Sequence, residues 1–182
     1  ASAMPYAVAI ELLYNFMLVH EDVQNANMER NDRPTIWWSW GPAQAINAGD
    51  GIHAMARISI FEQRNADGPS ADPRNISIAL QSLDTATLEV CEGEYLDISY
   101  QERAAVSVDE IVTVARKHGA LFGVAAKLGG IASAADESVL DALYKFGNAI
   151  GTAQNLNLDL QSLWPEPGSE RTEVQRGRLQ SK

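Results

Sequence analysis

The chain has 182 residues, of which 46% are hydrophobic, and a formal net charge of -10. Its length and composition fit one domain with a substantial core. The acidic balance, with a pI near 4.7, argues against a nucleic-acid-binding surface, which needs clustered lysine and arginine. The single cysteine, Cys91, excludes an intramolecular disulfide framework and a cysteine-based zinc site, so we expect a cytoplasmic protein.

Two long apolar stretches do not have the character of targeting or membrane-spanning segments. No basic region precedes the first, residues 7–19, so a secretory signal is not expected. That stretch is also shorter than the ~20 residues that span a bilayer. The second, residues 111–135, is longer but contains Arg116, Lys117 and Lys127. We therefore expect soluble helices and no transmembrane segment.

Apolar residues recur at helical spacing along almost the whole chain, and this predicts five helices. We expect them over residues 5–25, 42–61, 76–100, 108–130 and 136–164. No period-two alternation long enough for a sheet is present. The sequence therefore predicts an all-α domain over residues 1–182, in which residues 165–182 form a loop or a disordered tail.

Several helix boundaries carry specific signals. Pro5 suits the first turn of a helix. Ser107 followed three residues later by Glu110 matches a capping box. Asp136 can cap the last helix, and Pro165 ends it.

The connections between these helices contain breakers and aromatic residues. Residues 31–34 include Asn31, Asp32 and Pro34, and residues 65–75 are polar, so both stretches are predicted loops. Three tryptophans, at positions 37, 38 and 40, follow the first of these loops. We expect them to anchor that loop to the core.

A polar group follows the first apolar helix. Glu21 and Asn25 are four residues apart and share one helical face, with Asp22 beside them and Arg30 shortly after. Oxygen ligands of this kind suit Mg²⁺, and an arginine suits phosphate. The alternative is a helix end with solvated polar residues.

Two further groups are polar intrusions on apolar helices. Glu94 and Asp97 lie on the predicted 76–100 helix, and Lys117 and His118 lie within the 108–130 helix. The lysine can extend to solvent or can meet a bound anion. The other histidines, His20 and His53, fit structural roles better than a metal site.

In chain order, these segments resemble the trans-isoprenyl diphosphate synthase (polyprenyl synthetase) family. The resemblance covers nearly the whole chain and rests on residues 20–25 (HEDVQN), 30–35 (RNDRPT), 40–51 (WGPAQAINAGDG), 87–98 (TLEVCEGEYLDI), 117–129 (KHGALFGVAAKLG) and 146–153 (FGNAIGTA). It implies a bundle of helices around a central pocket, usually in a homodimer. It also implies Mg²⁺-dependent condensation of an allylic diphosphate with isopentenyl diphosphate, in which cations neutralise the leaving diphosphate.

Carried over position by position, the resemblance assigns roles to eight residues. Lys117 and Glu94 take catalytic positions, and Arg30, Lys117 and His118 take substrate-binding positions. The metal ligands would be Glu21, Asp22, Asn25 and Asp159.

The chain departs from the family pattern at several of these places. Asn25 stands for an aspartate, Asn31 for the second of two arginines, and Glu94 for a glutamine. In the second aspartate-rich motif, Leu158 and Ser162 replace acids and only Asp159 remains acidic. The segments that precede the first motif in the family are absent, which fits a fragment or a split subunit.

Two functions stay open on these residues. The first is a prenyltransferase with a weakened metal site, acting on allylic and isopentenyl diphosphates. The second is a catalytically silent member that serves as a structural or regulatory subunit of an active synthase. Both predict a homodimer or a complex with another synthase subunit.

Overall fold

The computed structural model describes residues 3–62 and 72–164. Its helices are α1 (Met4–Gln24), α2 (Ile36–Trp40), α3 (Pro42–Phe61), α4 (Pro73–Tyr100), α5 (Val108–His118), α6 (Ala120–Ala132) and α7 (Glu137–Leu163). Two short strands, β1 (Glu29–Arg30) and β2 (Arg33–Pro34), form an antiparallel hairpin. In this described part of the chain, no helix is long and apolar enough to cross a membrane.

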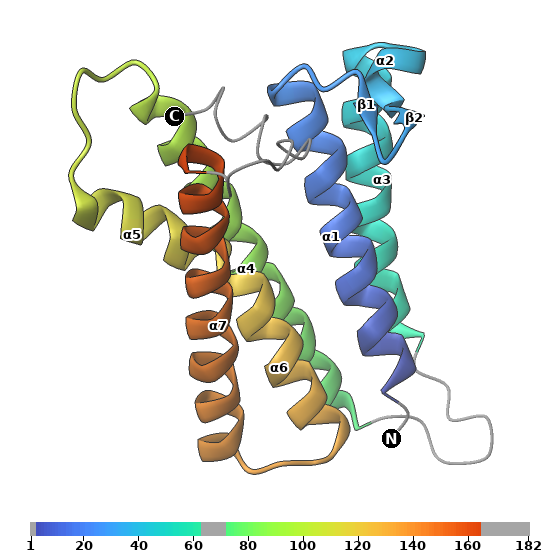
Figure 1. The fold of residues 1–182 in the computed structure, drawn as a ribbon. Coiled ribbons are helices and arrows are strands. Elements are labelled where there is room, and N and C mark those ends of the chain that lie inside the picture. The colour runs from blue at the N-terminus through green and yellow to red at the C-terminus, as the bar shows by residue number, and fades with distance from the viewer. Residues whose placement is uncertain (1–2, 63–71, 165–182) are drawn as a thin grey trace.

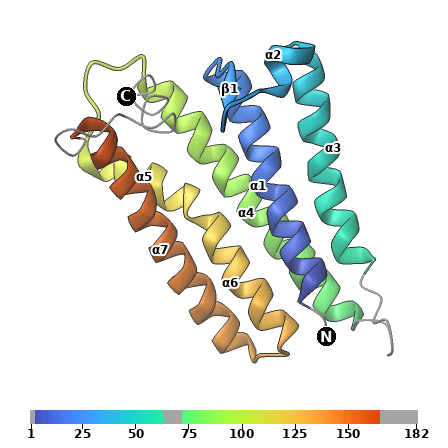
Figure 2. The ribbon, with the colours of Figure 1, turned by 45° about the vertical axis from the view of Figure 1, so that its right-hand side comes forward.

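The long helices form two groups that diverge toward one end of the molecule (Figures 1 and 2). In one group, α1 and α3 run side by side, and the hairpin and α2 lie at their shared end. In the other, α6 and α7 run antiparallel beside the long helix α4. The predicted all-α class is therefore confirmed. The predicted tail, residues 165–182, lies outside the described residues.

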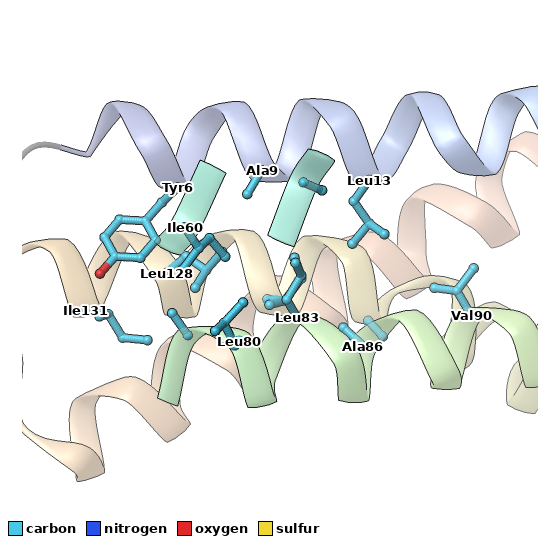
Figure 3. Close-up of a cluster of buried hydrophobic side chains, with 14 of the residues drawn as sticks. Tyr6, Ala9, Leu13, Ile60, Leu80, Leu83, Ala86, Val90, Leu128 and Ile131 are labelled. Carbon is cyan, nitrogen blue, oxygen red and sulfur yellow. The ribbon is translucent and has the colours of Figure 1, made fainter. Parts of the chain in front are cut away.

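The core lies where α1, α3, α4 and α6 meet. Leu13, Ile60 and Leu83 have no exposed surface, and Leu128 has almost none. Figure 3 shows these side chains pointing toward one another from the four helices. Burying each such side chain contributes about 1.5–3 kcal/mol, so this cluster holds the two groups together at the end where they converge.

Most predicted helix bounds agree with the structure, but α4 starts earlier than expected. It begins at Pro73 instead of residue 76, because the carboxylate of Asp72 accepts a hydrogen bond from the backbone N–H of Arg74 at 2.9 Å. Pro73 occupies the first helical turn, where its missing N–H is not needed. The helix therefore includes residues 73–75, which were predicted as the end of a loop.

The expectation of no sheet is wrong at one place. Asn31 and Asp32, predicted as helix breakers in a loop, have a more specific role. Their φ angles are 53° and 58°, and they form the two-residue turn between β1 and β2. Two left-handed residues of this type are what a tight hairpin turn needs, and asparagine and aspartate tolerate that conformation.

The expected anchoring by three tryptophans is also wrong for two of them. Trp37 is half-buried and its Nε1 donates to the carbonyl of Asn27 at 2.6 Å. Trp38 and Trp40 are 54% and 68% exposed. They lie on α2, a five-residue helix capped by Thr35, whose hydroxyl accepts from the backbone N–H of Trp38.

The predicted helix over residues 108–130 is two helices that change direction at Gly119 (Figure 1). A side chain at Gly119 would come within 2.6 Å of the Asn148 carbonyl on α7. The apolar pattern continues through this position, so the sequence did not indicate the bend, whereas the close packing of Gly119 on α7 accompanies it.

The predicted capping box at the start of α5 is confirmed. Ser107 Oγ accepts from the Glu110 backbone N–H at 3.3 Å, and Glu110 Oε2 accepts from the Ser107 backbone N–H at 2.9 Å. Arg103 Nη1 donates to the same carboxylate at 2.7 Å. The hydrogen bond from Arg103, with those from Ser107, lowers the pKa of Glu110 to about 2.

We expect Ser107→Ala to lower the free energy of unfolding by about 1 kcal/mol, because α5 loses its cap. Urea unfolding monitored by circular dichroism measures this. Because the pKa of Glu110 is lowered in the folded protein, the ionised Glu110 side chain stabilises the fold at pH values above the ordinary pKa range of glutamate. This stabilisation is lost as the pH falls toward 2. Equal unfolding midpoints for the two proteins at neutral pH would contradict the cap's role.

Candidate active site

The end of α1 presents its acids to an arginine from the hairpin. Arg30 donates from Nη2 to Asp22 Oδ1 at 2.7 Å and to Glu21 Oε2 at 3.1 Å, and from Nε to Asp22 Oδ1 at 3.0 Å. Asn27 Nδ2 donates to the same Asp22 oxygen at 3.2 Å. The hairpin turn thus brings Arg30 back onto the last turn of α1.

This contact neutralises a buried carboxylate. Asp22 is only 6% exposed. Burial by itself would lower the pKa of the Arg30 guanidinium, but the hydrogen bond to Asp22 and the charges of Glu21 and Asp22 raise it on balance. Arg30 therefore stays charged and compensates an acid that would otherwise be costly to bury.

A cavity of about 180 Å³ lies between the two groups of helices and collects five of the eight predicted site residues. Glu21 comes from the last turn of α1 and Asn25 directly follows that helix. Glu94 comes from α4, His118 from the end of α5, and Asp159 from α7. These residues are separated by as many as 138 positions in the sequence, so their meeting in one cavity depends on the tertiary fold.

The cavity is strongly acidic. Four carboxylates line it, those of Glu21, Glu94, Asp97 and Asp159. Among the residues that the structure describes, no lysine or arginine lines it, and His118 is the one lining group able to carry positive charge. An anion would therefore enter only together with cations.

A second, more apolar cavity of about 470 Å³ adjoins the first. The two share six lining residues, which are Tyr14, Leu18, Glu21, Leu121, Phe122 and Asn155. Ile10, Ala125 and Leu158 extend the apolar wall, and Arg30 stands at its polar side with Glu21. The combined space has a charged part and a long apolar part.

Lys117 and Asp22 do not line either of these cavities. Lys117 Nζ donates to Glu92 Oε2 at 2.5 Å, which ties the end of α5 to α4. Asp22 faces Arg30 and Asn27 instead. The structure thus separates Lys117 from the acids of α1, although the sequence-based assignment grouped them.

The residues of the second aspartate-rich motif have three different environments on α7. Asp159 lines the acidic cavity, and Leu158 lines the apolar one. Ser162 is 1% exposed, and its hydroxyl donates to the carbonyl of Leu158 at 2.7 Å. Of these three residues, only Asp159 therefore offers a carboxylate to the cavity.

Three residues that shape the site had no predicted role. Asp97 lies one helical turn after Glu94, and this spacing was the available signal for it. Asn155 and Phe122 lie within or beside the segments that carry the family resemblance, but nothing in those segments showed that they face a cavity.

The rings of His20 and His53 both pack on Phe16, at centroid distances of 4.7 and 5.1 Å. His20 Nε2 lies 3.7 Å from Asp50 Oδ1 and 3.3 Å from the Ile46 carbonyl oxygen, and its ring packs on Phe16. A side chain at Gly49 would overlap the His20 ring. His20 thus fixes the end of α1 against α3, close to Glu21.

Within residues 3–62 and 72–164, no group of three or more histidine, cysteine or acidic side chains is arranged to hold a metal ion by itself. Mg²⁺ is usually held by one or two carboxylates together with substrate phosphates and water. Glu21 and Asp159 line the same cavity, so they could hold such a metal only together with ligands from a bound diphosphate.

Comparison with known proteins shows the family of this chain. The sequence profile of the Polyprenyl synthetase family matches residues 1–165. The (2E,6E)-farnesyl diphosphate synthase of Mycobacterium bovis is 35% identical over 167 residues, which cover 91% of this chain and 44% of that protein. The geranylgeranyl diphosphate synthase of Mycobacterium tuberculosis is 34% identical over 91% of this chain and 46% of its own length.

The fold also matches that of solved structures of related proteins. The crystal structure of geranylgeranyl pyrophosphate synthetase from Pyrococcus horikoshii Ot3 matches with a TM-score of 0.81 and 31% identity, over 90% of this chain and 49% of that one. The chain belongs to the polyprenyl synthetase family. It spans about half the length of these relatives.

Proposed function

We propose that this chain forms the allylic-diphosphate side of a trans-prenyltransferase site, which condenses an allylic diphosphate with isopentenyl diphosphate. One observation carries the proposal: an acidic cavity and an apolar cavity adjoin and share six lining residues. An allylic diphosphate has the same two parts, a charged head and an apolar tail. The named activities of the relatives support this reading.

The proposed chemistry starts with heterolysis of the allylic C–O bond, in which the electron pair leaves with the diphosphate. The double bond of isopentenyl diphosphate then attacks the allylic carbon, and the resulting cation gives a proton to the released diphosphate, which forms the double bond of the lengthened chain. Bound Mg²⁺ would supply positive charge to the leaving diphosphate. The apolar wall, with Leu18, Leu121 and Phe122, would keep water from the carbocation.

The side chains have distinct parts in this proposal. Glu21 and Asp159 would hold the metal from opposite helices, α1 and α7, and Asn25 would add a neutral oxygen. Arg30 stands beside Glu21 at the polar side of the apolar cavity, where it can reach a phosphate. Asp22 would support the site by holding Arg30.

We predict that binding of inorganic pyrophosphate, or of a non-reactive allylic diphosphate analogue, depends on Mg²⁺. Without the cation, four carboxylates repel the anion. Isothermal titration calorimetry with Mg²⁺ should show binding, and the same titration in EDTA should show none. Glu21→Gln should weaken the Mg²⁺-dependent binding about tenfold or more. Equal binding in EDTA would remove the reason for assigning a metal-dependent site.

We also propose that the chain works as a dimer or in a complex with a second synthase subunit. Apolar side chains are exposed along one side of α3, where Met55, Ile58 and Phe61 are 56%, 50% and 60% exposed. Such a stripe favours a protein partner. Sedimentation velocity at micromolar concentration should show a dimer or larger species, and a stable monomer would count against the proposal.

A further inference from the structure

His118 and Glu94 meet at the edge of the acidic cavity. His118 Nε2 lies 3.1 Å from Glu94 Oε1, and the histidine side chain is 17% exposed. Nε2 is otherwise buried without a hydrogen-bond partner among the described residues. The contact is an ion pair when the imidazole is protonated, because Nε2 then carries positive charge beside the carboxylate.

Gly93 leaves the space that the imidazole ring of His118 occupies. A side chain on Gly93 would come within 2.8 Å of His118 Cδ2 and 2.9 Å of Nε2. The ring therefore lies directly on the bare backbone of α4, one residue from Glu94. On the other side of Gly93, Glu92 binds Lys117. These two contacts join α5 to α4, and of the two only the contact of His118 with Glu94 lines the cavity.

We infer that His118 is a positioning residue that holds the Glu94 carboxylate and offsets its charge, so that a diphosphate can enter a cavity lined by acids. The inference rests on the proposed function. It adds His118 to the residues that determine how tightly the cavity binds a diphosphate. On this account His118 acts on Glu94 and does not bind the phosphate itself.

A double-mutant cycle separates these two roles, with Mg²⁺ and inorganic pyrophosphate as the probe in calorimetry. His118→Leu should weaken binding about tenfold, because the negative charge of Glu94 is then no longer offset. A tenfold change corresponds to one partly screened charge interaction. In a Glu94→Gln background, the same His118→Leu change should alter the affinity by less than about twofold.

Three further variants control the cycle. His118→Gln keeps an N–H donor but removes the positive charge, so it should weaken binding as His118→Leu does. Gly93→Ala displaces the ring without changing any charge, so it should weaken binding as His118→Leu does, and Glu94→Gln should rescue it. Glu89→Gln removes a carboxylate from α4 that binds Tyr144 outside this cavity, and it should not rescue His118→Leu. Urea unfolding identifies any variant that has lost its fold.

The outcomes are distinct. A tenfold loss in both backgrounds would show that His118 contacts the anion directly and would overturn the inference alone. No loss from His118→Leu in the wild-type background would overturn it too. Absence of Mg²⁺-dependent binding by the wild type would remove the proposed function and this inference with it.

Discussion

Arg30→Ala should lower the free energy of unfolding by about 3 kcal/mol. The variant leaves the carboxylate of Asp22, which is 6% exposed, without the guanidinium that donates to it at 2.7 and 3.0 Å. Losing one partner of a buried pair costs about 3–5 kcal/mol, and the partial exposure of Arg30 places this case at the lower end. Urea unfolding at neutral pH measures the change.

Two variants make this test specific. Arg33→Ala removes the same charge from the exposed partner of Arg30 in the hairpin and should change stability by less than about 0.5 kcal/mol. Adding Asp22→Asn to Arg30→Ala should recover most of the loss, because no buried charge is left unpaired. An unchanged midpoint for Arg30→Ala would mean that the pair does not form in solution.

Gly147→Ala should destabilise the protein by about 2–3 kcal/mol. The added methyl group would come within 2.3 Å of the Phe122 carbonyl oxygen and 2.8 Å of its carbonyl carbon, which are backbone atoms of α6 and cannot turn aside. Helices α6 and α7 would have to separate, and overpacking of this kind costs up to about 3 kcal/mol.

The matched control is Gly129→Ala on α6, where a new methyl group meets nothing within 4 Å. That change should be neutral or should stabilise by up to about 1 kcal/mol, since alanine favours the helix more than glycine. Equal unfolding midpoints for Gly147→Ala and Gly129→Ala would show that the helices do not approach as closely as described.

The sequence predicted features that depend on neighbouring residues along the chain. The capping box of Ser107 and Glu110 and the bounds of α3 were correct, because caps, prolines and apolar spacing are local signals. The hairpin was missed because Asn31 and Asp32 break a helix and also form a tight turn, and both outcomes use the same residue types.

Features that depend on distant contacts were not predictable in this way. The bend at Gly119 follows from packing on Asn148 and Thr152, some 30 residues later. The partner of Lys117 is Glu92, 25 residues earlier, so the sequence could not show that this lysine is already paired. The acids of the cavity were identified one by one, but their shared cavity and its lack of lysine and arginine among the described residues required the fold.

The close approach of α6 and α7 has a consequence for ligand size. Phe122 touches Gly147 with its backbone and lines both cavities. The distance between the two helix axes therefore helps to set how far Phe122 reaches into the space for a ligand. A substitution at position 147, which lines neither cavity, is therefore a way to change the size of that space from behind its wall.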